Sequence, residues 1–481
     1  MSTQAPESTA PRSIEEREQL SRQLNSRQLA MIAIGGAIGT GLFLGSSLAV
    51  HTAGPAVILS YLLGAVIALS LMRALSEMAV EHPTSGSFGV YAELYLNPWA
   101  GFAVRYTYWA AQCVAIGGEA TAIAIYCQWW FPHTPAWLWV LLFSVALVWV
   151  NARSVGSFGS FEYWFAMIKV AAIIIFIVFG ASLLLSPFLG FASTNSAIGF
   201  HNLTAYGGFF PLGWRGVWMA MAFVIFSYIG TEVIAVTAGE AKDPQVAIPR
   251  AMRSMVFRLI LFYLCSIVLV ISIVPWNQIQ PGAAVTASPF VKVFQLIGVP
   301  AAAHLINFVV ITAAASSMNC NLYLVTRMMF SLARGGYAPS GLGRVSARGV
   351  PLPALFISAA GLALALLISF LFPSSAFVYL FGISLFGGLF AWLLVFVTHM
   401  AFRARHPQAS SSSSSSAAPM RAAGFPYFSL FGGASMVAIL ATTWWVEGMR
   451  ITLISGLSWL AFLTLVYFLV ARRRLISAPA D

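Results

Sequence analysis

The chain contains twelve long, continuously apolar segments, and these constrain its fold more than any other feature. About 20 helical residues cross the hydrocarbon core of a bilayer, which is roughly 30 Å thick. The segments do not alternate between apolar and polar residues, so transmembrane strands do not explain them. We therefore predict an all-α polytopic membrane protein with twelve transmembrane helices, at 29–50, 55–80, 99–131, 135–152, 160–186, 214–239, 254–275, 298–333, 353–372, 374–402, 427–446 and 450–471.

The composition excludes a soluble protein. Of the 481 residues, 59% are hydrophobic and 8% are charged, whereas about a quarter of the residues in a soluble domain carry a charge. The net charge of +11 would otherwise suggest a nucleic-acid partner. In a membrane protein it fits basic loops at the cytoplasmic face. We expect the lipid bilayer as a partner and no nucleic acid, and the oligomeric state stays open.

The distribution of Lys and Arg predicts the orientation. With the N-terminus inside, 21 of the 25 Lys and Arg residues fall on the cytoplasmic side and 3 on the outer side. This asymmetry follows the positive-inside rule, so both termini are expected in the cytoplasm. The predicted organisation is a tail at 1–28, a transport core at 29–402, a Ser-rich cytoplasmic linker at 403–426, two additional helices at 427–471 and a tail at 472–481.

Two of the predicted helices are interrupted in mid-membrane. The first carries four Gly within residues 35–41, and the sixth reads FSYIGTE over residues 226–232. Each Gly weakens a helix by about 1 kcal/mol relative to Ala. An interruption within the bilayer is tolerated where it is buried in protein or lines a wet cavity. Small residues also let helices pack closely, but the second interruption favours a binding site over packing alone.

The two interruptions lie five spans apart, so the helices that carry them cross the membrane in opposite directions. This is the arrangement of an inverted repeat, here 29–186 and 214–402. After the first break, free N–H groups at Thr40 and Gly41 present partial positive charge. Before the second, free carbonyls near Phe226 and Ile229 present partial negative charge. This pair of poles fits the carboxylate and the ammonium group of an amino acid.

Three stretches of the sequence are long enough to compare with known families: RQLNSRQLAMIAIGGAIGTGLFLGS (22–46), MRALSEMAVEHPTSGSF (72–88) and FSYIGTEVIAVTAGEAKDPQVAIPRA (226–251). In this order they resemble motifs of the amino acid transporter family of the amino acid–polyamine–organocation superfamily. The resemblance implies a LeuT-type fold of five plus five helices with broken helices 1 and 6, plus two extra helices. It also implies a proton-coupled amino acid importer of the bacterial inner membrane.

The resemblance further implies that the main chain of the two breaks contacts the substrate. The positions that match the family motifs are Ala37, Thr40, Gly41, Phe226, Ile229 and Gly230. The adjoining residues complete the set of candidates: Ile38, Gly39, Ser227 and Thr231. We expect no cofactor, because four scattered cysteines and no clustered His residues give no metal-binding spacing.

Three ionisable residues within the spans are candidates for proton coupling: Lys169, Glu119 and Glu232. Inserting such a group at the centre of a membrane helix costs roughly 2.5–3.5 kcal/mol. Each is therefore expected to serve a function or to make a satisfied interhelical contact. Lys169 is expected beside the first break, where sodium-driven relatives of this fold hold a cation, with Ser316 and Ser317 as partners. Glu119 is a candidate proton acceptor, and Glu232 is expected at the cavity edge.

The leading prediction is an amino acid importer driven by protons, and two alternatives stay open. An exchanger on the same fold would need no net proton entry, and a channel would conduct far faster than a carrier. A membrane enzyme is disfavoured because the sequence lacks a cluster of catalytic side chains, and it has no ATP-binding motif for a pump. Glu240, Lys242 and Asp243 lie at the inner end of the sixth span, and the sequence favours a solvated charged turn there. The alternative is that they pair with cytoplasmic arginines when the inner gate is shut.

Overall fold

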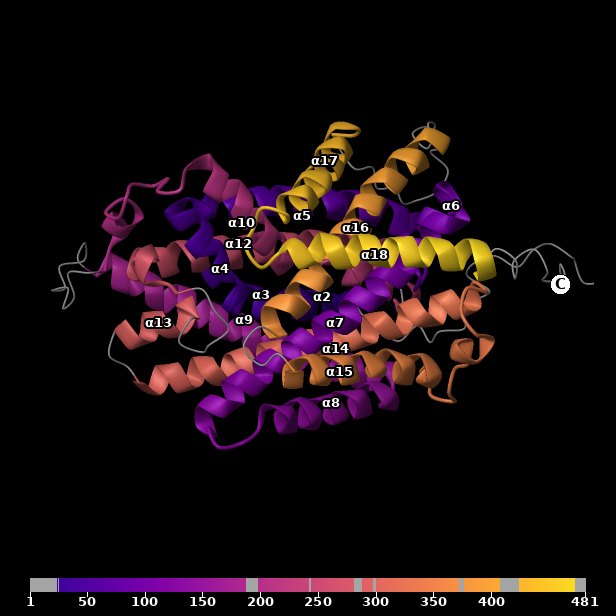
Figure 1. The fold of residues 1–481 in the computed structure, drawn as a ribbon, viewed down its shortest axis with the longest axis horizontal. Helices are drawn as coiled ribbons and strands as arrows, with labels where there is room; N and C mark the ends of the chain where they lie inside the picture. The colour runs from indigo at the N-terminus through magenta and orange to yellow at the C-terminus, as the bar shows by residue number, and fades with distance from the viewer. Residues whose placement is uncertain are drawn as a thin grey trace, which may run out of the picture.

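Helices running side by side along the long axis of the molecule form the body of the protein (Figure 1). The computed structural model describes residues 24, 26–186, 198–241, 244–280, 288–296, 300–371, 376–406 and 424–471. Most of the predicted N-terminal tail, most of the Ser-rich linker and the C-terminal tail lie outside these described residues.

The predicted first repeat consists of helices joined by short connections: α2 (Ser26–Ala37), α3 (Thr40–Phe43), α4 (Gly45–Ala53), α5 (Val57–Glu81), α6 (Ser87–Tyr95), α7 (Pro98–Trp130), α8 (Ala136–Arg153) and α9 (Val155–Leu185). The predicted second repeat and the two additional helices follow: α10 (Gly213–Tyr228), α11 (Val233–Val236), the 3-10 helix η3 (Thr237–Glu240), α12 (Pro244–Ile273), α13 (Pro289–Leu296), α14 (Pro300–Arg334), α15 (Leu352–Leu371), α16 (Ala376–Arg405), α17 (Tyr427–Thr442) and α18 (Arg450–Val466).

The helices agree with an all-α polytopic membrane protein. In the described part of the chain, nine helical segments are long and apolar enough to cross a membrane. Shorter apolar helices, Gln28–Ala37, Leu352–Ala363 and Tyr427–Thr442, fall in three further predicted spans. Two helices were not predicted, α6 and α13, because at nine and eight residues they are too short to cross a bilayer.

The helices that carry the ionisable candidates begin at well-defined caps. The side-chain oxygen of Asn97 accepts a hydrogen bond from the N–H of Ala100 (2.9 Å), and Pro98 occupies the first helical position of α7. At α9 the hydroxyl of Ser154 accepts a hydrogen bond from the N–H of Ser157 (3.1 Å). These caps fix where α7 and α9 start, and so help to fix the rotation at which Glu119 and Lys169 face their neighbours.

One end of the bundle is closed by a buried ion pair. The Nε of Arg327 donates to the carboxylate of Glu240 at 3.0 Å, and the hydroxyl of Tyr323 donates to the same carboxylate. The N–H of Leu24 donates to the main-chain carbonyl of Glu240 (3.1 Å). Segments from η3, α14 and the chain before α2 are thereby tied together. Glu240 is buried and paired with an arginine, so the favoured expectation of a solvated charged turn was wrong for this residue and the alternative holds.

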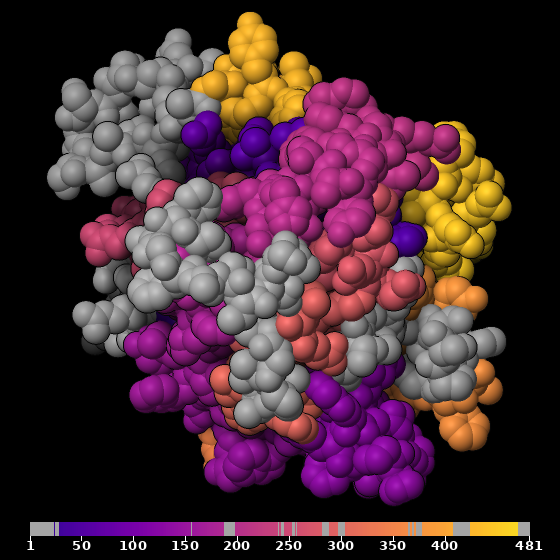
Figure 2. Space-filling model, turned by 90° about the vertical axis from the view of Figure 1, so that its left-hand side faces the viewer, coloured from indigo at the N-terminus to yellow at the C-terminus, as the bar shows by residue number. Residues whose placement is uncertain are grey.

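Aromatic rings pack against one another at the opposite end of the bundle. The ring of Phe290 in α13 lies 5.0 Å from that of Phe43 and 4.9 Å from that of Phe176, measured between ring centroids. The hydroxyl of Ser288 donates to the carbonyl of Phe43 (3.0 Å). Figure 2 looks onto this end, where the segment around the 3-10 helix Phe200–Leu203 spreads over the surface.

The fold predicts that Gly230 tolerates no side chain. Its φ of +104° is unfavourable for other residues, and an added Cβ would lie 2.5 Å from the carbonyl oxygen of Gly36. We expect Gly230→Ala to lower the free energy of unfolding by about 1–3 kcal/mol. Thermal unfolding of the purified protein in detergent measures this. Gly433→Ala is the matched control, because its Cβ would make an ordinary 3.7 Å contact with Phe396, and its melting temperature should not fall.

Candidate functional site

The two predicted breaks are present, and they lie against each other at the centre of the bundle. Helix α2 ends at Ala37, and Gly39 is extended (φ −128°, ψ −155°) before α3 begins. Helix α10 ends at Tyr228, and Ile229 is extended (φ −63°, ψ 138°). An added Cβ at Gly41 would lie 3.2 Å from the Cα of Ser227. The approach of the two main chains therefore depends on glycine.

Tyr263 of α12 links the two breaks. Its hydroxyl lies 2.8 Å from the carbonyl of Ala37 and 2.7 Å from the carbonyl of Ser227. Both carbonyls belong to turns that no longer make a full set of helical hydrogen bonds. One buried hydroxyl, with a single hydrogen to donate, thus lies between main-chain carbonyls from both interrupted helices. Sequence reasoning did not identify it.

Lys169 supplies the remaining donors to the first break. Its ammonium nitrogen donates to the carbonyl of Gly35 (2.6 Å) and to that of Ile38 (2.7 Å), and its side chain is fully buried. The expected serine partners do not bond to it. Ser316 donates to Glu162 and Ser317 donates to Glu119. The hydroxyls of Ser316 and Ser317 thus donate to carboxylates, while the ammonium group of Lys169 donates to main-chain oxygens.

Glu119 of α7 occupies the positive pole that was predicted for the substrate. One carboxylate oxygen accepts a hydrogen bond from the hydroxyl of Ser317 (2.9 Å). The other faces the N–H of Thr40, the first residue of α3, at a longer 3.4 Å. A carboxylate is favourable at this helix end because several N–H groups there have no helical partner. A substrate carboxylate would have to share or take over this position.

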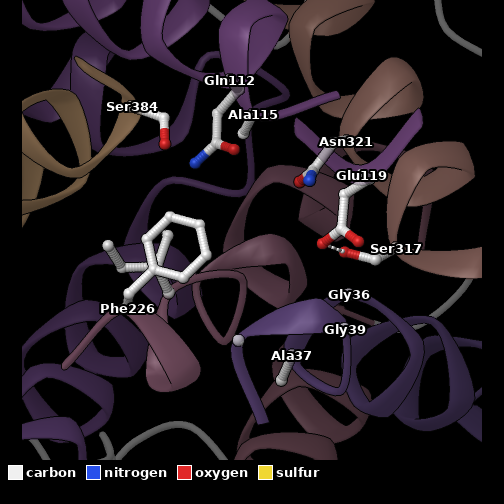
Figure 3. Close-up of a pocket in the computed structure, with 12 residues that line it drawn as sticks. Gly36, Ala37, Gly39, Gln112, Ala115, Glu119, Phe226, Ser317, Asn321 and Ser384 are labelled. Carbon is white, nitrogen blue, oxygen red and sulfur yellow. Dashed lines mark hydrogen bonds between the residues drawn. The ribbon is translucent and has the colours of Figure 1, made fainter. Parts of the chain in front are cut away.

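A small cavity lies between the breaks and three neighbouring helices, α7, α14 and α16. Its lining is Gly36, Ala37, Gly39, Gly41, Gln112, Ala115, Glu119, Phe226, Ile229, Ser317, Asn321 and Ser384 (Figure 3). It offers about 20 Å³ to the centres of water molecules, which is room for about one water. An amino acid can enter only if the lining side chains move apart.

The cavity contains part of the predicted set of substrate contacts. Five predicted residues line it: Ala37, Gly39, Gly41, Phe226 and Ile229. Five others belong to the breaks but do not line it: Ile38, Thr40, Ser227, Gly230 and Thr231. The polar lining residues were not predicted. Gln112 lies seven residues before Glu119 on α7, and Asn321 lies four residues after Ser317 on α14, so helical spacing was the available signal.

We expected Glu232 at the edge of the cavity. It lies instead beside the second break and does not line the cavity. Its carboxylate accepts hydrogen bonds from the hydroxyl of Tyr108 (2.6 Å), from the indole N–H of Trp392 (3.2 Å) and from the N–H of Gly230 (3.0 Å). The carboxylate therefore fastens the break in the sixth span to α7 and α16. Tyr108 and Trp392 are distant from Glu232 in sequence, which explains why residue type alone suggested a cavity position.

Comparison with known proteins shows the family to which the chain belongs. The family model described as amino acid permease matches residues 28–475. The chain is similar to the probable threonine/serine transporter YbxG of Bacillus subtilis (strain 168), with 36% identity over 94% of this chain and 95% of the relative. It is similar to the gamma-aminobutyric acid permease of the same organism, with 37% identity over 96% of each chain. A third relative there, the uncharacterized amino acid permease YvbW, shares 38% identity over 94% of this chain and 98% of its own.

The match spans nearly the whole chain. It includes the two interrupted helices and also α7 and α9, which carry Glu119 and Lys169. The relatives are aligned over almost their full lengths, so the match covers the complete helical body and not a shared fragment. This protein belongs to the amino acid permease family.

Proposed function

We propose that this protein imports an amino acid across the bacterial inner membrane by proton symport and alternating access. The observation that carries the proposal is the carboxylate of Glu119 at the N-terminus of α3, where the substrate carboxylate is expected. We further propose a LeuT-type arrangement of two inverted five-helix repeats with two added helices, and cytoplasmic termini. The buried ion pair at one end of the bundle and the aromatic packing at the other support a carrier, because a channel needs a continuous path.

Glu119 gives a physical reason for coupling. Two carboxylates at one helix end repel each other, so the substrate carboxylate binds best when Glu119 is protonated or has moved away. A proton and the substrate then favour each other's binding, and by linkage the effect is reciprocal. Mutual attraction of this kind is what a symporter requires, whereas an exchanger requires none.

Lys169 is proposed as the second coupling group. Its ammonium group holds two main-chain oxygens of the first break, as a bound cation would. If Lys169 lost its proton, the carbonyls of Gly35 and Ile38 would no longer face a positive charge, and the break would loosen. Protonation of Lys169 and the position of α2 are thereby coupled. The proton can shift the equilibrium between two positions of α2 only by the difference in its affinity for them. Glu232 is proposed to hold the second break in place during this change.

The lining favours an uncharged, polar side chain in the substrate. Gln112, Asn321 and Ser384 present amide and hydroxyl groups beside the two breaks. The names of the relatives, a probable threonine/serine transporter and a gamma-aminobutyric acid permease, include both α- and γ-amino acids. We propose that the substrate of this protein is an α-amino acid, because the two breaks, whose main-chain groups form the two poles, lie against each other.

The first transport prediction concerns recognition of the substrate's carboxylate and amino group. An added Cβ at Gly41 would lie 3.1 Å from the ring of Phe226, so Gly41→Val fills the space between the breaks. We expect uptake to fall at least about tenfold, equivalent to 1.4 kcal/mol, while the protein still reaches the membrane. Uptake of labelled amino acids in proteoliposomes measures this, with Gly433→Ala as the control.

A competition panel completes that test. All twenty amino acids and γ-aminobutyrate are added against the labelled substrate, together with methyl esters and decarboxylated amines. We expect the esters and amines to compete poorly, because each lacks one of the charges that the breaks bind. Equal competition by these analogues would rule out the binding mode.

The second transport prediction concerns the driving force. Accumulation in proteoliposomes should follow an imposed pH gradient in the absence of sodium. Lys169→Ala should lose this dependence, because no ammonium group remains at the carbonyls of Gly35 and Ile38, although substrate binding can persist. A strict sodium requirement, or normal proton-driven accumulation by Lys169→Ala, contradicts the proposal. Strict dependence on internal amino acid identifies an exchanger instead.

A further inference from the structure

Glu162 is a buried carboxylate that the proposed mechanism does not use. It lies on α9, seven residues before Lys169, so the two side chains share one face of the helix two turns apart. Its side chain is fully buried, as is that of Lys169. Leaving a charge uncompensated in such a place is costly, so each of these groups needs a partner.

The contacts of Glu162 bring it to the first break. The hydroxyl of Ser316 and the side-chain amide of Asn319 (3.0 Å) donate to its two oxygens. An added Cβ at Gly35 would collide with the Glu162 carboxylate. Gly35 is also the residue whose carbonyl accepts the hydrogen bond from Lys169. The carboxylate and the ammonium group therefore both lie against Gly35.

The other buried cations in the described residues have direct partners. Arg105 pairs with Glu93, and Arg327 pairs with Glu240 at 3.0 Å. Lys169 has no carboxylate at ion-pair distance among the described residues, and it bonds instead to carbonyl oxygens. Two carboxylates nevertheless reach the break that it binds: that of Glu162 lies against Gly35, and that of Glu119 faces the N–H of Thr40.

Apart from Glu119, the described side chains packed around this pair are uncharged. Cys320 on α14 contributes a thiol, and Tyr263 on α12 contributes the hydroxyl that links the breaks. Helix α8 contributes Asn151, whose amide donates to Asn319 (2.7 Å) and so orients it toward Glu162. Asn319 and Ser316 act as donors to Glu162. These hydrogen bonds favour the charged form of Glu162, against the opposing effect of its burial. With its carboxylate held against Gly35, whose carbonyl binds the ammonium group, Glu162 is placed to balance the charge of Lys169.

We propose that Glu162 is the counter-charge of Lys169 and a positioning residue for proton coupling, setting the external pH at which the lysine carries its proton. The carboxylate does not touch the substrate, and it acts through Lys169 and the peptide unit of Gly35. The inference rests on the proposed proton symport. Without Glu162, the ammonium form of Lys169 loses its compensating charge, so more acidic conditions are needed to keep it.

The pH profile of uptake tests this role. For Glu162→Gln we expect the pH of half-maximal uptake to move toward acid by at least about one unit, the usual effect of a neighbouring opposite charge. Glu162→Asp keeps the charge and should stay close to the wild type. Glu93→Gln, a carboxylate-to-amide change in the cluster with Arg105, should not move the half-maximal pH, whatever its effect on rate. An unmoved profile in Glu162→Gln overturns the proposal.

Thermal stability tests the charge pair without reference to transport. Glu162→Gln leaves a lone ammonium group and Lys169→Met leaves a lone carboxylate, whereas the double variant leaves neither. We expect the melting temperature of the double variant to exceed that predicted by adding the two single effects. If Glu162→Gln fails to reach the membrane, the double variant should recover membrane levels. Additive effects, or no recovery, overturn the pair. A wild type without proton dependence refutes symport, while the stability cycle still decides the pairing.

Discussion

Main-chain hydrogen bonding inside a membrane is the constraint on which the rest of this structure depends. A helix that unwinds in the bilayer exposes N–H and carbonyl groups that water cannot reach, and each must find a partner. Around the first break those partners are Lys169, Tyr263 and Glu119. The break in the sixth span is secured by Glu232 and by the same tyrosine. The ionisable residues within the spans carry a free-energy cost in the membrane. They are thus the groups that make the interruptions possible.

The same contacts give the site its chemistry. A carboxylate at the N-terminus of α3 and an ammonium group at the carbonyls of α2 place opposite charges on opposite sides of one short stretch of main chain. A zwitterionic substrate offers the same two charges. In the proposed mechanism its binding competes with these groups of the protein, and their protonation changes the competition. Under that proposal, proton coupling needs no separate site away from the substrate.

The sequence predicted the apolar helices and the two breaks, because both depend on local patterns. Continuous apolar runs specify helices in lipid, and four Gly within 35–41 weaken one of them. It did not predict Gln112, Asn321 or the partners of Glu232, because these depend on how helices far apart in sequence are rotated. Glu162 was missed because its seven-residue spacing from Lys169 becomes meaningful only once the helix face toward Gly35 is known.

The most direct test of this account is whether substrate binding takes up a proton. The purified protein in weakly buffered detergent solution, with a pH indicator, receives a saturating amino acid near neutral pH. If the substrate carboxylate takes over the position of Glu119, binding should be accompanied by uptake of on the order of one proton. Glu119→Gln should bind the substrate without that uptake. Binding by the wild-type protein with no proton uptake, or with proton release, would contradict the account.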